Sequence, residues 1–267
     1  MKCGRSSQGF TIVETMIFLA VSGALLLAAM TFITSSQNGT QFKQGANDAL
    51  QEVNKVINNV ANGYFAGDDS VVCTVNPART AVTAGVDASS EGKGTNKDCV
   101  FLGRVIEFGA PGSTAFTVRD VAGVRTLKLS SGAITEPTTM REALPALISG
   151  TQQEVALRYG LKFGSLKRAT TGGSYSSAGF FSRLGKIAGT PESGNLESTA
   201  QQFDFIGYSD FSTDINDASY ESKRDSIMDE GLELCLHDGS RQAIITIGGP
   251  QRSSTTTLTI NDGDCSP

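Results

Sequence analysis

The sequence predicts an α+β protein in which a long N-terminal helix packs on an antiparallel β-sheet body. The first observation is an apolar run over residues 9–34, in which Glu14 is the only charged residue. The second is that apolar residues recur at intervals of three and four from Phe42 to Ala61, which is typical of an amphipathic helix. The third is that apolar and polar residues alternate on both sides of a turn near the C-terminus, which is typical of an antiparallel hairpin.

The apolar run predicts a transmembrane segment over residues 10–34. A helix needs about 20 apolar residues to cross a bilayer, and this run is long enough. Lys2 and Arg5 precede it, with no acidic residue among the first eight, so the N-terminal end should stay in the cytoplasm. The chain is therefore expected to be a single-pass protein of the inner membrane with an extracytoplasmic C-terminal domain.

Glu14 is the unusual residue of this segment, because a charge inside a membrane is costly and usually functional. It lies four residues into the span, about 6 Å along a helix from the cytoplasmic end. Cleavage after Gly9 would give Phe10 a free amino group. That amine and Glu14 of a neighbouring subunit could then pair, each offsetting the cost of burying the other.

The order Gly9-Phe10-Thr11-Ile12-Val13-Glu14, followed by a long apolar helix, resembles the processing site of type IV pilins and type II secretion pseudopilins. The resemblance covers roughly the first fifty residues, and its motif is specific. It implies that residues 1–9 are a leader, which a prepilin peptidase removes between Gly9 and Phe10 before methylating the new amine. It also implies that Glu14 neutralises the N-terminus of an adjacent subunit in a filament. One departure is that many major pilins carry a proline midway along this helix, whereas the first proline here is Pro77.

In that family the partners are other pilin subunits, the prepilin peptidase and the inner-membrane assembly machinery. The length of the chain and its elaborated middle favour a minor pilin or a large pseudopilin over an abundant subunit. Two other interpretations remain open. The run could be an ordinary secretory signal peptide, with the small residues Ala28 and Ala29 near its end, or a plain signal anchor. Either would carry an extracytoplasmic binding or adhesion module with a β-rich domain.

Composition agrees with a structural protein that is exported. The 267 residues suffice for one sizeable domain beside the helix, and 30 glycines with seven prolines predict many turns. The net charge of −5 gives no basic footprint for nucleic acid. With one histidine and no phosphate-binding loop or metal-ligand cluster in the sequence, we expect no cofactor and no enzyme activity.

The cysteines predict two disulfides. Cys3 lies in the leader, and the even set that remains, Cys73, Cys99, Cys235 and Cys265, allows three connectivities in an exported domain. Proximity in sequence favours Cys73–Cys99 and Cys235–Cys265, and the second bond is similar to the disulfide-bounded C-terminal region of many pilins. The alternative is four buried thiols.

The helix is expected to continue from residue 10 to residue 62, with Asn62-Gly63 as its C-cap. Its polar face includes Asp48 and Glu52. A β-rich globular head should then occupy residues 63–267 and begin with an elaborated loop at about 64–98, in which residues 70–75 form a short strand. The acidic tract Asp210–Glu230 is interpreted as a solvated loop and helix face, with a calcium site as the alternative, although its spacing fits no EF-hand.

The remaining elements follow from local patterns. Strands are expected at Cys99–Phe108, Val155–Phe163, Gly179–Ile187 and Phe203–Gly207. A hairpin is expected from residues 115–121 and 125–129 around Ala122-Gly123, a short helix over 138–149, and a loop over 166–177. The C-terminal meander should comprise Leu232–His237, a turn at Asp238-Gly239, Arg241–Ile247 and Thr256–Ile260.

Overall fold

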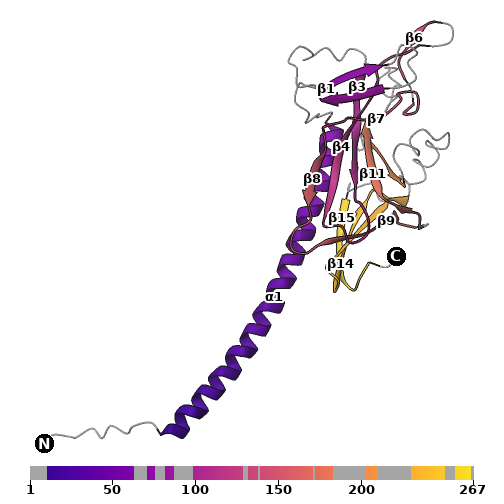
Figure 1. The fold of residues 1–267 in the computed structure, drawn as a ribbon. Helices are drawn as coiled ribbons and strands as arrows, with labels where there is room; N and C mark the ends of the chain where they lie inside the picture. The colour runs from indigo at the N-terminus through magenta and orange to yellow at the C-terminus, as the bar shows by residue number, and fades with distance from the viewer. Residues whose placement is uncertain are drawn as a thin grey trace, which may run out of the picture. The chain divides into compact units, whose positions relative to one another are not determined.

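The computed structural model describes residues 11–62, 71–75, 82–86, 99–128, 132–137, 139–170, 172–182, 203–209, 230–249 and 256–265. The predicted leader, most of the 64–98 segment and all of the acidic tract except Glu230 lie outside these residues. The described chain has an α+β fold, with the long helix α1 (Ile12–Ala61) and antiparallel sheets (Figure 1). It divides into two compact units, Met1–Gln44 and Gly45–Pro267.

Helix α1 confirms the predicted helix almost to the residue. It contains no proline and runs unbroken through Gly23 and Gly39. The part of α1 from Gly45 onward belongs to the second unit, and its apolar stripe is buried there, at Ala46, Ala49, Val53, Val56, Ile57 and Val60. On the same part of the helix, Asn54 Oδ1 accepts a hydrogen bond from Thr256 Oγ1 at 2.8 Å.

The larger sheet of the second unit has six antiparallel strands. The order is β12 (Phe203–Tyr208), β11 (Ser177–Ser182), β3 (Cys99–Glu107), β4 (Ala115–Val124) and β7 (Ala146–Leu147). A short strand, β8 (Gln153–Ala156), pairs with the other end of β4. The predicted strands at 99–108 and 203–207 are confirmed, and the one expected from Gly179 begins two residues earlier.

The second sheet has five antiparallel strands and contains the predicted C-terminal meander. Its order is β10 (Ser174–Tyr175), β9 (Lys162–Arg168), β13 (Leu232–His237), β14 (Arg241–Ile247) and β15 (Thr256–Asp262). The two sheets meet through aromatic rings, since Phe108 at the end of β3 stacks on Phe163 of β9 with ring centroids 5.1 Å apart. Both rings are buried and belong to the core.

The hairpin predicted around Ala122-Gly123 is wrong. Strand β4 continues through both residues, and Gly123 pairs with Val100 of β3. A side chain at Gly123 would collide with the carbonyl oxygen of Ala143 and with Leu102, so this glycine permits close packing instead of forming a turn. The chain turns later, where β5 (Leu127–Lys128) pairs with β6 (Ile134–Thr135).

The helix predicted over 138–149 is also wrong, because only one turn forms. Thr139 and Glu142 make a reciprocal pair: the Glu142 N–H donates to Thr139 Oγ1, and the Thr139 N–H donates to the Glu142 carboxylate. Leu144 then adopts a φ of +49°, and Pro145 follows it, so the turn ends and the chain enters β7.

Two further predictions need correction. The strand expected over 155–163 is two strands, β8 and β9, separated by a turn in which Tyr159 and Gly160 have φ values of +58° and +74°. The 64–98 segment, expected to hold one short strand, contains the paired strands β1 (Val71–Val75) and β2 (Val82–Val86). The loop expected over 166–177 contains the end of β9 and all of β10.

The predicted turn at Asp238-Gly239 is confirmed, and a carboxylate organises it. Asp238 Oδ1 accepts hydrogen bonds from the N–H groups of Ser240 at 2.9 Å and Arg241 at 2.8 Å. Asp238 Oδ2 lies 2.6 Å from Arg241 Nη2. Partial burial of the Asp238 carboxyl opposes its ionisation, but the hydrogen bonds from Ser240 and Arg241 outweigh that effect and lower its pKa from 3.8 to about 2.

Asp238 should therefore make stability depend on pH in the acid range. Because its pKa is lower in the folded state, its contribution is present above pH 3.8 and is lost as the pH falls through about 2. Asp238→Asn keeps an oxygen acceptor but removes the charge. We expect it to destabilise the protein by roughly 1–2 kcal/mol at pH 7 and by progressively less below pH ~4. Thermal unfolding of both proteins in detergent, from pH 7 to pH 2, tests this; a gap that stays constant over that range contradicts it.

Candidate assembly helix and surface groove

The first part of α1, residues 12–33, presents large apolar side chains that the described chain leaves uncovered. Ile12 and Phe32 are each 77% exposed and Phe18 is 70% exposed, values far outside those of a core helix. The helix is long and apolar enough to cross a membrane, as a signal sequence at an N-terminus also is. This is consistent with the predicted single-pass membrane protein.

Glu14 lies in the first turn of α1, and its backbone N–H takes part in the N-terminal cap of the helix. The Glu14 N–H donates to Thr11 Oγ1 at 3.3 Å, so Thr11 is the N-cap and Glu14 the third helical residue. A carboxylate at this position favours the helix electrostatically, because the free N–H groups carry partial positive charge. The predicted cleavage residues Gly9 and Phe10 lie just before it, outside the described residues.

The Cys235–Cys265 disulfide is confirmed, and its two cysteines are 30 positions apart in the sequence. Cys235 is in β13 and Cys265 follows β15, and β14 lies between these two strands. The bond therefore holds the segment after β15 back across the sheet. That segment packs tightly, because a side chain at Gly164 of β9 would collide with Cys265 Sγ.

Removing this bond should cost stability without changing the fold. The chain-entropy model gives ~3–4 kcal/mol for a closed loop of this length. We expect the double variant Cys235→Ser/Cys265→Ser to lose about that much unfolding free energy in denaturant titration, with the wild type under reducing conditions losing at least as much. A loss below about 1 kcal/mol would mean that the bond does not constrain the unfolded chain as the model requires.

Cys99 also takes part in a disulfide. Its predicted partner, Cys73, has a side chain outside the described part of the structure, so the Cys73–Cys99 pairing stays a prediction. The acidic tract, where a calcium site was the alternative, likewise lies outside. Among the described residues, no group of three or more His, Cys, Asp or Glu side chains could hold a metal ion.

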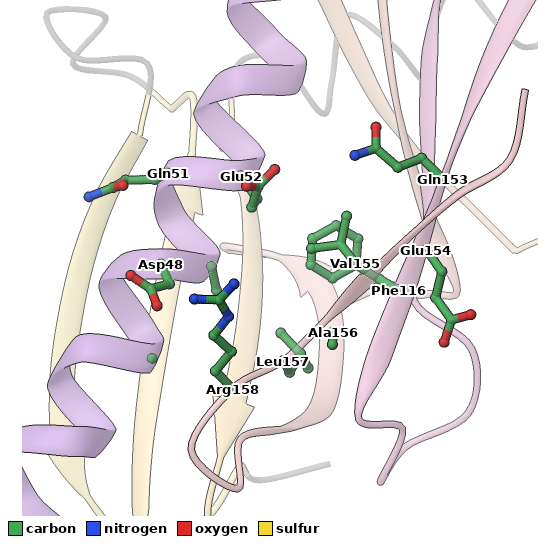
Figure 2. Close-up of a pocket in the computed structure, with 12 residues that line it drawn as sticks. Asp48, Gln51, Glu52, Phe116, Gln153, Glu154, Val155, Ala156, Leu157 and Arg158 are labelled. Atoms are coloured by element: carbon green, nitrogen blue, oxygen red, sulfur yellow. The ribbon is translucent and has the colours of Figure 1, made fainter.

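A groove of about 410 Å³ lies within the second unit, between α1 and strand β8 (Figure 2). Its helical wall is formed by residues 45–52, its opposite wall is residues 153–158, and Phe116 of β4 also lines it. Most of its charged side chains are acidic: Asp48, Glu52 and Glu154, against the single Arg158.

Sequence reasoning missed this groove. It placed Asp48 and Glu52 on a polar face of the helix, which is correct but does not say what lies opposite them. Glu154 was just outside a strand that was predicted at the wrong residues. The spacing of Asp48 and Glu52, four residues apart on one helix face, was the available signal.

Comparisons with protein-family models, with curated proteins and with solved structures find no match for this chain. A long N-terminal apolar helix and an antiparallel sheet body are compatible with a pilin-like protein. A function for this protein must therefore be inferred from the residues of α1 and of the sheet body.

Proposed function

We propose that this protein is a structural subunit, a minor pilin or pseudopilin, of a type IV pilus or type II secretion filament. The observation that carries the proposal is the long, continuous helix α1. Its first part is apolar and uncovered, a carboxylate stands in its first turn, and its last part is buried in the β-rich unit. An ordinary signal peptide needs neither the carboxylate in the first turn nor a continuation of the helix into the β-rich unit.

The proposed mechanism uses the same apolar surface twice. Before assembly, residues 10–34 cross the inner membrane, with the β-rich head outside the cytoplasm. A prepilin peptidase cuts between Gly9 and Phe10, and the assembly machinery transfers the helix from lipid into a bundle of neighbouring helices. Little hydrophobic free energy separates lipid from such a bundle, because both surround the helix with apolar groups. A polar contact must therefore supply specificity.

Glu14 is suited to supply that contact. In an apolar bundle its carboxylate needs a cation, and the methylated amine of Phe10 on an adjacent subunit provides one. Pairing a specific Glu14 with a specific amine fixes the axial offset of neighbouring subunits, because an unpaired buried charge would be costly in any other register. The protein acts here through assembly, with no catalytic group and no cofactor.

The experiment that tests this function is mass spectrometry of the mature N-terminus. A chain that begins at methylated Phe10 supports prepilin processing. The second candidate, an exported or anchored binding module, predicts either a start near Met30 or an intact Met1. A Gly9→Leu variant is the matched control, because a bulky residue at the cleavage position should leave the leader attached while the rest of the chain is unchanged.

A further inference from the structure

Strand β8 has one edge that no described residue pairs, and that edge lines the groove beside α1. We propose that this edge binds an extended, basic segment of a partner protein, which adds to the six-stranded sheet as a further strand next to β8. The groove residues all belong to the second unit, so this inference goes beyond the filament proposal and does not depend on it.

The backbone hydrogen bonds show which groups of β8 are available. The Leu157 N–H donates to the Thr114 carbonyl at 2.8 Å, so these residues form a hydrogen-bonded pair of the antiparallel ladder. Such pairs alternate along antiparallel strands, so Val155 and Gln153 bond to β4 in the same way. The N–H and C=O groups of Glu154 and Ala156 must then point away from β4, toward the groove.

An unpaired strand edge is a template for another strand. Natural proteins usually block such edges with proline, a bulge or inward-pointing lysine. The β8 sequence, Gln-Glu-Val-Ala, contains no proline and no lysine; its one charged residue is Glu154, and its pairing with β4 is regular. The open groove leaves this edge accessible instead of covering it with the helix (Figure 2).

The charges around the edge select the partner. Asp48 and Glu52 occupy the helical wall, and Glu154 lies on β8 itself with its side chain directed away from the helix (Figure 2). Arg158 and the exposed Lys55, whose Nζ is 3.3 Å from Glu52 Oε2, offset part of this charge. Three carboxylates against two basic side chains leave a small excess of negative charge around the edge, so lysine or arginine on the partner would be favoured, above all beside Glu154.

The probe is a fluorescent six-residue peptide of alternating lysine and valine, titrated against the full-length protein in detergent. The charge-reversed peptide, with glutamate in place of lysine, and the flexible polyamine spermidine are the controls. We expect the lysine peptide to bind, with an affinity that falls as salt rises. Equal binding of the glutamate peptide, full displacement by an equal charge concentration of spermidine, or no binding of the lysine peptide at millimolar concentration would each overturn the proposal.

Ala156→Pro tests the role of the backbone. The Ala156 N–H points away from β4, so proline there removes the outward donor while leaving the β4 ladder intact. Ala156→Thr is the matched control, since it also enlarges this exposed side chain but keeps the N–H. We expect the proline variant to bind the lysine peptide at least tenfold more weakly and the threonine variant to bind within twofold of wild type. Equal affinities of the two variants would overturn strand addition.

Two measurements keep the test decisive if the proline variant folds poorly. The surface variant Asp48→Asn/Glu52→Gln/Glu154→Gln should weaken peptide binding more than fivefold, and unchanged affinity would exclude the charge selection. Hydrogen exchange on the wild type should show the Glu154 and Ala156 amides slowed by the peptide, while the Val155 amide is already protected without it. Slowing confined to other parts of the chain would place the peptide elsewhere and overturn the proposal.

Discussion

Replacing Asp120 by alanine is expected to lower the free energy of unfolding by about 3–5 kcal/mol. Asp120 of β4 lies directly opposite Arg104 of β3, and its Oδ1 is 2.8 Å from Arg104 Nε. The two side chains are only 6% and 5% exposed, in a sheet that is otherwise apolar at this point. Removing the carboxylate leaves a buried guanidinium uncompensated. Denaturant titration of the full chain in detergent measures the loss.

A double variant separates the free energy lost when one partner of this pair is removed from the net contribution of the pair to stability. Burial raises the pKa of Asp120 above 3.8, because desolvation outweighs the charge and hydrogen bond of Arg104, which lower it. The attraction therefore does not fully compensate for burying the charges. We expect Arg104→Met/Asp120→Leu to lie within about 1 kcal/mol of wild type or to be more stable. A double variant as unstable as Asp120→Ala would show that the ion pair itself stabilises the sheet.

A more exposed ion pair between the same two strands serves as a control. Arg119 Nη1 lies 3.3 Å from Glu107 Oε1, and these side chains are 23% and 35% exposed. Water still solvates them, so Glu107→Gln should cost less than about 1 kcal/mol. The contrast between the two pairs would then follow from burial, since the strands and the residue types are alike.

The elements that the sequence predicted correctly are those whose own residues carry a clear local pattern. The stripe at the end of α1 repeats at helical spacing over five turns, and the β13–β14 hairpin closes through Asp238 only a few residues away. The failures need distant neighbours. Gly123 was interpreted as a turn because its close contact with Ala143 cannot be deduced from residues beside it.

The buried ion pair and the groove could not be predicted from the sequence, because both depend on how distant elements pack. Residues Leu102 to Ile106 of β3 are all buried, so this central strand is covered on both faces and its burial shows no alternation that would mark Arg104. The groove forms only when β8 is brought opposite Asp48, about a hundred residues earlier in the chain. Local periodicity places each wall on its own element, but it cannot place the walls opposite one another.

Replacing Glu14 by alanine is expected to remove the protein from filaments while leaving it in the membrane. In the proposed bundle the change would leave the amine of Phe10 on the adjacent subunit without a partner. An uncompensated buried charge costs about 3 kcal/mol or more, a factor of over a hundred in each subunit's association. Immunoblotting of sheared filaments and of the membrane fraction measures both outcomes. Glu14→Gln should fail similarly, because it keeps the shape of the side chain and removes only the charge.

Thr11→Ala distinguishes this intersubunit role from a role within the helix. Thr11 Oγ1 caps α1 by accepting from the Glu14 N–H, so its loss weakens the first turn by roughly 0.5–2 kcal/mol but keeps the carboxylate. If Glu14 acts by stabilising the start of α1, Thr11→Ala and Glu14→Ala should reduce assembly to a similar degree. If Glu14 acts by pairing with a neighbour, Thr11→Ala should assemble nearly as wild type does. Wild-type assembly by Glu14→Ala itself would contradict the filament proposal and favour a membrane-anchored binding module, for which this carboxylate has no partner to meet.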